Sequence, residues 1–177
     1  MTAVLERRKK IEFNFSKQKA IETILYLANK RPSIDKMSLY KFLFFADEEH
    51  LNRYGRPIVG DYYVAMQFGP VPSHIKNLLE KNKNSEFQID DYMITATRAS
   101  NTDYLSKSDM EVLDEIYDKL QGYSARELST LSHEHPAWLK ARDKNIFRNN
   151  NRLDYEDIIK DPELLKEVQE YSRAIVF

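Results

Sequence analysis

Cysteine is absent from this 177-residue sequence, and glycine is scarce. Without cysteine, disulfide bonds and thiolate metal sites are excluded, and the absence suits a reducing compartment. The four glycines stand at positions 55, 60, 69 and 122, so neither a Gly-x-Gly-x-x-Gly fingerprint nor a phosphate-binding P-loop is present. A Gly-x-Ser-x-Gly nucleophile elbow is missing as well. These absences argue against nucleotide-dependent and acyl-transfer enzymes.

The sequence also lacks a basic excess and a long apolar run. Its net charge is −1, whereas nucleic-acid-binding domains usually carry an excess of lysine and arginine. The longest apolar runs, such as residues 42–46, are far too short to cross a bilayer. Basic residues at positions 7–10 are not followed by the apolar core of a secretion signal. We therefore expect a cytoplasmic protein without a membrane partner, and a nucleic-acid partner is not favoured.

What is present is enough for one compact domain. The chain is 42% hydrophobic, and a chain of this size buries roughly 70% of its unfolded surface. We expect a basic arm over residues 1–14 and a single domain over residues 15–177 that ends in a helix and an apolar tail. The predicted fold class is α+β and predominantly α-helical, with about six to eight helices and a small antiparallel sheet or hairpin. The order of the elements is loosely that of a winged-helix module.

Two helices are predicted to open the domain. The first spans residues 16–30, where apolar residues recur at positions 21, 24, 25 and 28 and so share one face. The second begins after Ser33 or Asp35, either of which can cap it, and ends near Gly55, which can adopt the left-handed conformation. Apolar side chains cover almost its full circumference, so we expect a central helix with Phe42 and Phe44 both buried.

The next segment is predicted to contain strands. Residues 62–68 are apolar at nearly every position, which indicates a strand buried on both faces or a strand covered by helices. Residues 69–72 read Gly-Pro-Val-Pro, and we expect them to interrupt the ladder because neither proline has an N–H to donate. Pro72 then suits the first turn of a helix through Leu79. Residues 87–97 are predicted as one or two strands, with a bulge or tight turn where the alternation slips at Asp90 and Asp91.

The remainder is predicted to be helical. Ser124 and Glu127 form a capping box, and Ser106 with Asp109 forms a weaker one. A last helix begins with Asp-Pro-Glu at residues 161–163, and its apolar face is assigned to residues 164, 168 and 171.

The titratable residues contain no recognisable catalytic constellation. His133, Glu134 and His135 have the right residue types for zinc, but two histidines at i and i+2 reach one metal only from a non-helical backbone. Pro136 allows such a backbone, so a metal-assisted hydrolase is the weakest alternative that stays open. Otherwise one histidine caps a helix or packs beside Trp138, and the other is solvated.

An acidic run at residues 47–49 precedes His50 near the end of the central helix. We expect this run to mark the exposed edge of the helix and to pair with Arg53 and Arg56. A helix C-terminus and nearby acids both favour a protonated imidazole, so a charged His50 is expected.

A DNA-binding alternative rests on the helix after Pro72, because its polar side chains can contact phosphates. These residues are His74, Lys76, Asn77, Lys81 and Lys83. Lysines are equally typical of any solvated helix face, so the pattern does not distinguish the two readings.

Several short motifs follow one another in an order that resembles one known family. A lysine-led aromatic segment at 41–46 precedes Tyr-Gly-Arg-Pro at 54–57, an apolar strand at 62–66 and Gly-Pro-Val at 69–71. Residues 127–133 then read Glu-Leu-Ser-Thr-Leu-Ser-His, and residues 136–138 read Pro-Ala-Trp, in which the alanine departs from the family's Pro-Trp. By these motifs, residues 16–141 resemble the Panacea domain, the SocA-like antitoxin family.

The resemblance implies a non-enzymatic antitoxin, without cofactor or metal, that neutralises a toxin encoded beside it by direct binding. A cognate toxin is the expected partner, in a toxin–antitoxin system of the kind also found in phages and prophages. Some relatives are adaptors that deliver a toxin to a protease, and this stays open as an alternative.

Exposed aromatic residues and arginines are the usual anchors of protein interfaces. On that ground the partner-binding candidates are Tyr54, Arg56, Tyr62, Trp138 and Phe177. Trp138 suits the core as well as an interface. Phe177 ends an apolar tail, residues 174–177, which can dock on its own domain, lie in a partner's groove or act as a protease recognition tail.

Overall fold

The computed structural model describes residues 10–81, 86–143 and 151–174 of the chain. Their helices are α1 (Lys17–Ala28), α2 (Lys36–Tyr54), α3 (Ser73–Lys81), α4 (Lys107–Leu120), α5 (Ala125–His133), α6 (Pro136–Asp143) and α7 (Pro162–Ala174). Their strands are β1 (Ile34–Asp35), β2 (Tyr63–Met66), β3 (Gly69–Pro72), β4 (Phe87–Asp90), β5 (Met93–Ala96) and β6 (Asn151–Arg152), with short 3-10 helices at Thr102–Tyr104 and Tyr155–Asp157. The predicted class, a mostly helical α+β domain with small antiparallel sheets, is confirmed.

The first two helices begin at polar caps. Ser16 Oγ accepts a hydrogen bond from Lys19 N–H (3.3 Å) before α1, and Asp35 Oδ1 accepts one from Ser38 N–H (2.8 Å) before α2. Of the two caps predicted for α2, Asp35 is therefore the one used. The helix ends at Gly55, whose φ of +70° is the left-handed conformation that glycine adopts without strain.

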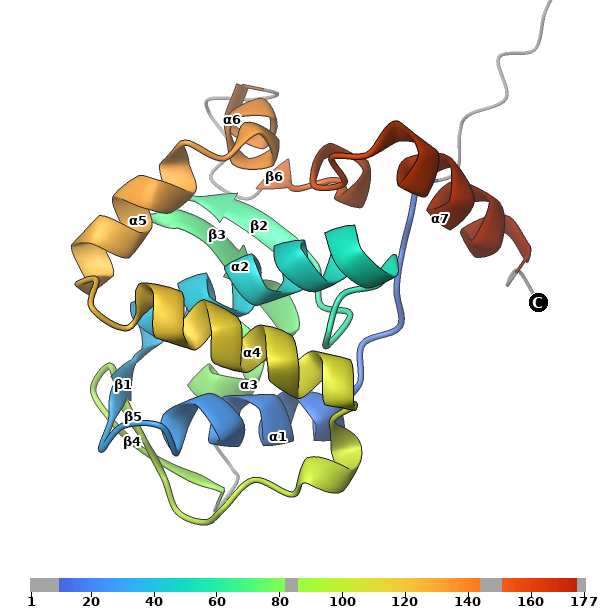
Figure 1. Ribbon diagram of the computed structural model, residues 1–177. Helices are drawn as coiled ribbons and strands as arrows, with labels where there is room; N and C mark the ends of the chain where they lie inside the picture. The colour runs from blue at the N-terminus through green and yellow to red at the C-terminus, as the bar shows by residue number, and fades with distance from the viewer. Residues whose placement is uncertain (1–9, 82–85, 144–150, 175–177) are drawn as a thin grey trace, which may run out of the picture.

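Helix α2 is the central helix of the fold. Figure 1 shows it crossing the middle of the molecule, with α4 on one side and the β2–β3 hairpin on the other. Phe42 packs in an apolar cluster with residues of α1 and α4, whereas Phe44 packs in a second cluster with Tyr63 and Ala65 of β2. Phe42 is 1% exposed and Phe44 is 0% exposed, so the prediction that both are buried is confirmed.

The Gly-Pro-Val-Pro segment is a strand, which corrects the expectation that it interrupts the ladder. As β3 it pairs antiparallel with β2 and forms the edge of a sheet in the order β3-β2-β6. Ser73 N–H donates to the Tyr62 carbonyl (3.0 Å), so these two residues form a hydrogen-bonded pair. Hydrogen-bonded pairs alternate along an antiparallel ladder, so the backbone N–H and C=O of Val71 also point toward β2. Pro70 and Pro72 fall between these positions, and their nitrogens point away from β2, where no donor is needed.

Strand β2 is buried on one face, not on both as predicted. Tyr63 and Ala65 point into the core and are 2% and 0% exposed. Val64 and Met66 alternate with them and are half-buried on the opposite side. The outer face of this sheet is therefore apolar and partly open.

The second sheet has the order β1-β5-β4. Asp91 and Tyr92 form the two-residue turn between β4 and β5, and the φ of Asp91 is +53°, which aspartate tolerates. The tight turn predicted here is confirmed. Because the chain folds back, Ile89 lies opposite Ile94 on one face of the sheet, whereas the sequence pattern had placed them on opposite faces.

Both ends of the described chain pack on the domain. Ile11, in the predicted basic arm, is 1% exposed within the second apolar cluster. On α7, Val168 is buried. It packs closely against Gly55 at the end of α2, since a Cβ added at Gly55 would lie 3.3 Å from Val168 Cγ2. Tyr171 is 71% exposed, so its assignment to the inner face of α7 is wrong. Phe177 lies outside the described residues, and the division of the chain at residue 14 stays a prediction.

Candidate functional site

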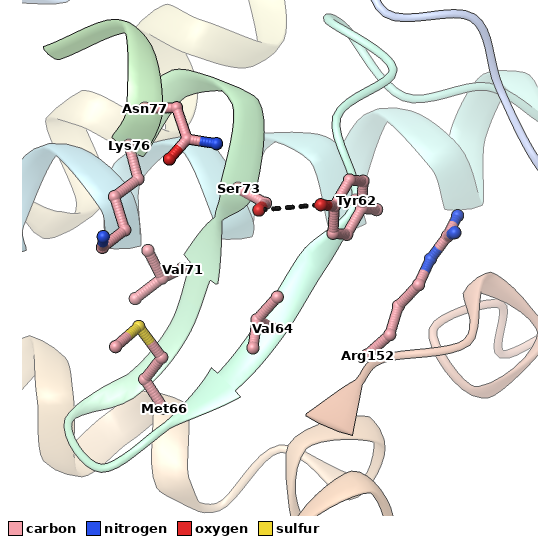
Figure 2. Close-up of a pocket in the computed structure, with 8 residues that line it drawn as sticks. All are labelled: Tyr62, Val64, Met66, Val71, Ser73, Lys76, Asn77 and Arg152. Carbon is pink, nitrogen blue, oxygen red and sulfur yellow. Dashed lines mark hydrogen bonds between the residues drawn. The ribbon is translucent and has the colours of Figure 1, made fainter. Parts of the chain in front are cut away.

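The outer face of the β3-β2-β6 sheet forms an open hollow (Figure 2). In Figure 2 the apolar side chains of Val64, Met66 and Val71 lie between Lys76 of α3 on one side and Arg152 of β6 on the other. The hollow has a volume of about 310 Å³. That is the small end of the range of roughly 300–1,000 Å³ found for small-molecule pockets. Its lining is mixed, because Ser73, Asn77, Lys76 and Arg152 surround the three apolar side chains. Apolar side chains beside polar ones suit contact with a partner surface of the same mixed character.

A second hollow of about 370 Å³ adjoins the first, between the start of α2 and the turns of the two hairpins. Met66, Val71 and Lys76 line both hollows, so the two are neighbours on one surface. Phe68 and Tyr92 are 55% and 64% exposed, and each is the second residue of a two-residue hairpin turn. We call the combined area the hairpin surface, with apolar residues Tyr62, Val64, Met66, Phe68, Val71 and Tyr92.

All the charged residues lining the hairpin surface, within the part of the chain that the structure describes, are cations. They are Lys36, Lys41, Lys76 and Arg152. Lys76 Nζ lies 2.6 Å from Glu80 Oε1, and Arg152 Nη1 lies 3.0 Å from Glu12 Oε1. Exposed ion pairs of this kind contribute little stability, so carboxylates of a partner can replace Glu80 and Glu12 without a large loss. Cations therefore line this surface, with Glu80 and Glu12 partly neutralising two of them, although the chain as a whole has a net charge of −1.

Lys41 differs from the other three cations, because its side chain is buried beneath the β2–β3 hairpin. It is 1% exposed, and its Nζ donates to the Pro70 carbonyl at 3.0 Å. Burial lowers the pKa of this ammonium to about 7. Gly69 has no side chain and therefore leaves room for Lys41. A Cβ added at Gly69 would lie 2.8 Å from Lys41 Cε and would overlap Ser132 Oγ. Lys41 therefore holds the edge strand in place and forms part of the floor of the second hollow.

At the other end of α2, polar groups converge on the carboxylate of Asp109, which is 0% exposed. Lys19 Nζ (2.6 Å), Arg56 Nη1 (3.1 Å) and His50 Nε2 (3.2 Å) all contact it, and we call these four residues the Asp109 cluster. Burial by itself would raise the pKa of Asp109, but hydrogen bonds from Lys19 and from Ser106 N–H hold that pKa below its ordinary value. The cluster joins α1, α2 and α4.

The surroundings of His50 favour the protonated ring less than the sequence led us to expect. Its Nδ1 lies 2.8 Å from the Arg56 carbonyl oxygen, which can only accept, so Nδ1 carries a proton. Its Nε2 lies 3.0 Å from Ser108 Oγ. Burial lowers the pKa of His50, because the charged ring loses its water, and this outweighs the nearby carboxylate of Asp109.

Asp47 also departs from expectation, since it does not lie on an exposed edge of α2. It is 5% exposed and accepts hydrogen bonds from Ile58 N–H and Tyr63 Oη, both at 2.7 Å. Burial raises the pKa of Asp47 to about 6. The carboxylate ties α2 to the chain that leads into β2.

The other two acids of the run have different neighbours. Glu48 lies 3.4 Å from His135 Nε2 and 2.8 Å from Lys160 Nζ, so it connects α2 to the segments around α6 and α7. Burial alone would raise the pKa of Glu48, but the contacts with His135 and Lys160 lower it overall. Glu49 forms the predicted pair with Arg53, at 2.6 Å.

The two histidines beside Trp138 have structural contacts. The His133 ring stacks on Trp138 with centroids 4.2 Å apart, and Trp138 Nε1 donates to the Met66 carbonyl at 3.1 Å. His135 Nδ1 accepts a hydrogen bond from Ala137 N–H (3.1 Å) at the start of α6. The packing predicted for one histidine is confirmed, but the other is 9% exposed, not solvated. Within residues 10–81, 86–143 and 151–174, no three histidine or acidic side chains are grouped to hold a metal ion.

The structure separates the five predicted partner-binding residues. Tyr62 lies on the hairpin surface, and Trp138 lies beside it, hydrogen-bonded to the backbone of β2. Tyr54, which is 47% exposed, and Arg56 lie at the opposite end of α2, where Arg56 is engaged with the Asp109 cluster. Phe177 lies outside the described residues. A role in partner binding stays a prediction for each of them.

Sequence reasoning missed the exposed aromatic residues of the hairpin surface. Phe68 comes directly before Gly-Pro at 69–70, and Tyr92 directly follows Asp-Asp at 90–91. Both positions are next to turn signals, and connecting segments run over the surface of a protein. That signal was available, but Phe68 was assigned to a buried strand.

Comparison with known proteins gives one match. The sequence model of the family described as antitoxin SocA-like, Panacea domain, matches residues 39–139, more than half of the chain. The chain belongs to this family. No curated protein and no solved structure matches it. The matched part of this Panacea domain includes the whole β2–β3 hairpin, α3 and Asp109, whereas Arg152 lies beyond it. Within the part that the structure describes, its helices are too short or too polar to cross a membrane.

Proposed function

We propose that this Panacea domain is an antitoxin that binds one toxin protein directly and neutralises it within the complex, without catalysing a reaction. The family match over residues 39–139 carries this proposal. The hairpin surface supports it, because an exposed apolar patch rimmed by polar residues is typical of protein-binding surfaces. We place the complex in the cytoplasm, as one half of a toxin–antitoxin pair.

Growth of cells that express the neighbouring genes tests the proposal. Each open reading frame beside this gene is expressed alone and together with the Panacea domain. We expect one frame to stop growth alone, growth to return on co-expression, and the two proteins to co-purify. If every adjacent frame is harmless when expressed alone, the antitoxin proposal fails for this chain.

The abundance of the toxin distinguishes neutralisation by binding from delivery to a protease. Neutralisation within a complex leaves the toxin level unchanged or higher when growth returns. An adaptor lowers that level, and growth returns only in cells that retain the protease. Quantitative immunoblots of a tagged toxin, with and without the Panacea domain, therefore decide between the two modes.

A further inference from the structure

We propose that the hairpin surface is where the toxin binds, and that it takes a toxin segment carrying both apolar side chains and carboxylates. This inference rests on the proposed antitoxin function and adds to it a site and a partner chemistry. The apolar face, the surrounding cations and the blocked strand edge each support a part of it.

The outer face of the β3-β2-β6 sheet carries apolar side chains. An antiparallel sheet with one solvated face normally carries polar residues on that face. Here the outward positions are the half-buried Val64 and Met66 of β2, with Val71 of β3 beside them at 8% exposure. Phe68 and Tyr92 extend this area with the two hairpin turns. Aromatic side chains exposed beside a contiguous apolar area are the residues that contribute most to protein interfaces.

The charges decide which partner fits. Lys36, Lys76 and Arg152 line the apolar area, and the charged residues among its described lining are all cations. A partner surface with carboxylates opposite these cations gains complementary charge and faster association, whereas a basic surface would be repelled. Nucleic acid would also meet cations, but protein–DNA interfaces are more polar and much more basic than this surface. An acidic and apolar protein segment is therefore the better match.

The mode of binding follows from β3. This strand is the edge of its sheet, and a strand added by a partner would need donors along that edge. Pro70 and Pro72 have no N–H there, and the Pro70 carbonyl already accepts from Lys41. Pairing of a toxin strand with β3 is therefore blocked. The toxin segment is recognised by side chains that enter the two hollows of about 310 and 370 Å³.

Selection of short random peptides displayed on phage, with the purified protein as bait, tests this chemistry without the toxin. We expect the selected peptides to combine aliphatic or aromatic residues with aspartate or glutamate. Phe68→Ser with Tyr92→Ser, and separately Lys76→Glu with Arg152→Glu, should each weaken binding of the best peptide by about tenfold or more. Circular dichroism confirms that each variant is folded.

The chain offers matched controls for both double variants. Tyr104 and Tyr123 are each 47% exposed and lie outside the hairpin surface, so Tyr104→Ser with Tyr123→Ser controls for the aromatic pair. Lys107 and Lys119 are exposed on α4, so Lys107→Glu with Lys119→Glu controls for the change of charge. Both controls should bind the peptide within about twofold of the unaltered protein, as expected of residues outside an interface hot spot.

Several results of the peptide experiment would overturn the proposal. Selected peptides that are basic, or that bind the variants and the unaltered protein equally, show that the hairpin surface does not have this preference. A duplex DNA probe that binds more tightly than the best peptide, and is lost with Lys76→Glu and Arg152→Glu, assigns the surface to nucleic acid. A dimer in analytical ultracentrifugation that Phe68→Ser with Tyr92→Ser dissociates assigns it to self-association.

The same variants in the growth assay separate this inference from the proposed function. If an adjacent toxin is found, both hairpin-surface variants should fail to restore growth while both controls restore it. If all four variants restore growth, the proposed function stands and the hairpin surface is not the toxin site. If no toxin exists but the peptide preference holds, the antitoxin function fails, and so does the assignment of this surface to a toxin.

Discussion

At the C-terminal end of α2, three side chains converge on the buried carboxylate of Asp109, whereas the hairpin surface leaves aromatic side chains in solvent. The two regions lie on different parts of the same domain, and both contain residues that the sequence nominates for partner binding. In the Asp109 cluster, Arg56 has its hydrogen bonds within the chain. At the hairpin surface, Phe68 and Tyr92 are more than half exposed.

The difference shows how exposed aromatics and arginines should be weighed as interface candidates. A guanidinium whose donors are already engaged with a buried carboxylate stabilises its own fold, and removing it disturbs that fold. An exposed aromatic residue in a chain that otherwise buries its apolar groups contributes little to its own fold and is free for a partner. Substitutions in the Asp109 cluster should therefore act on stability, and substitutions of exposed side chains at the hairpin surface should act on binding.

The largest effect is expected for Asp109→Ala. Lys19 and Arg56 would lose their buried partner, and α4 would lose the Asp109 half of its capping box. We expect the free energy of unfolding to fall by about 3–5 kcal/mol, the usual consequence of breaking a buried ion pair. Urea denaturation measures it. Glu111→Ala, exposed on the same helix, should stay within about 0.5 kcal/mol. Equal losses for the two variants would show that the buried contacts of Asp109 contribute no more to stability than an exposed side chain of the same helix.

Gly69→Ala tests whether the floor of the hairpin surface is as rigidly packed as the Asp109 cluster. Gly69 has a φ of +102°, and an added Cβ would overlap Ser132 Oγ and press on Lys41. Backbone strain and overpacking together should lower the free energy of unfolding by about 2–4 kcal/mol. Gly122 has no other atom within 4 Å of an added Cβ, so Gly122→Ala is the control. A loss of similar size for the control would mean that the Lys41–Gly69 contact is unimportant.

The buried Lys41 predicts a pH dependence of stability. Its pKa is lowered to about 7 in the fold, from an ordinary value of 10.5. Between these values the unfolded chain binds more protons than the folded one, so the free energy of unfolding should rise with pH. Relative to Lys41→Met, the unaltered protein should gain about 2 kcal/mol between pH 7.5 and pH 9.5, because the slope approaches 1.4 kcal/mol per pH unit. Urea denaturation of both proteins at the two pH values measures the gain, and parallel behaviour of the two would contradict it.

The smallest effect on stability is expected for Phe68→Ser and Tyr92→Ser, the variants expected to have the largest effect on binding. Their side chains are 55% and 64% exposed, so little apolar contact is lost. Each should change the free energy of unfolding by no more than about 0.5 kcal/mol. Thermal unfolding followed by circular dichroism measures this. A loss above about 2 kcal/mol, typical of core truncations, would place these residues in the core and not on a free surface.

Much of the fold could be predicted because its signals are local. Asp35, Gly55, the Ser124 capping box and the turn at Asp91 all act on neighbouring backbone groups, so sequence spacing was enough to find them. The central helix was identified by its apolar circumference, and the burial of Phe42 and Phe44 followed. The candidate surface was found only in part: Tyr62 was nominated, whereas Phe68 and Tyr92 were not.

The errors share a physical cause, which is that the deciding partner lies far along the chain. Gly-Pro-Val-Pro becomes a strand because its prolines face away from β2, and the sequence does not state which side of a strand is paired. Asp47 is buried because Ile58 and Tyr63 bring donors to it. The pKa of His50 is lowered because burial outweighs the nearby carboxylate of Asp109.

The sequence by itself determined the kind of protein this is. Its periodicity defines the main helices, and its ordered short motifs identify the Panacea family, because each of these signals lies in residues close together in the chain. Tertiary structure alone decided which apolar and charged groups are exposed. Exposure depends on which distant segments meet, so the hairpin surface could be recognised only once β2, β3, α3 and the turn at Tyr92 had been brought together.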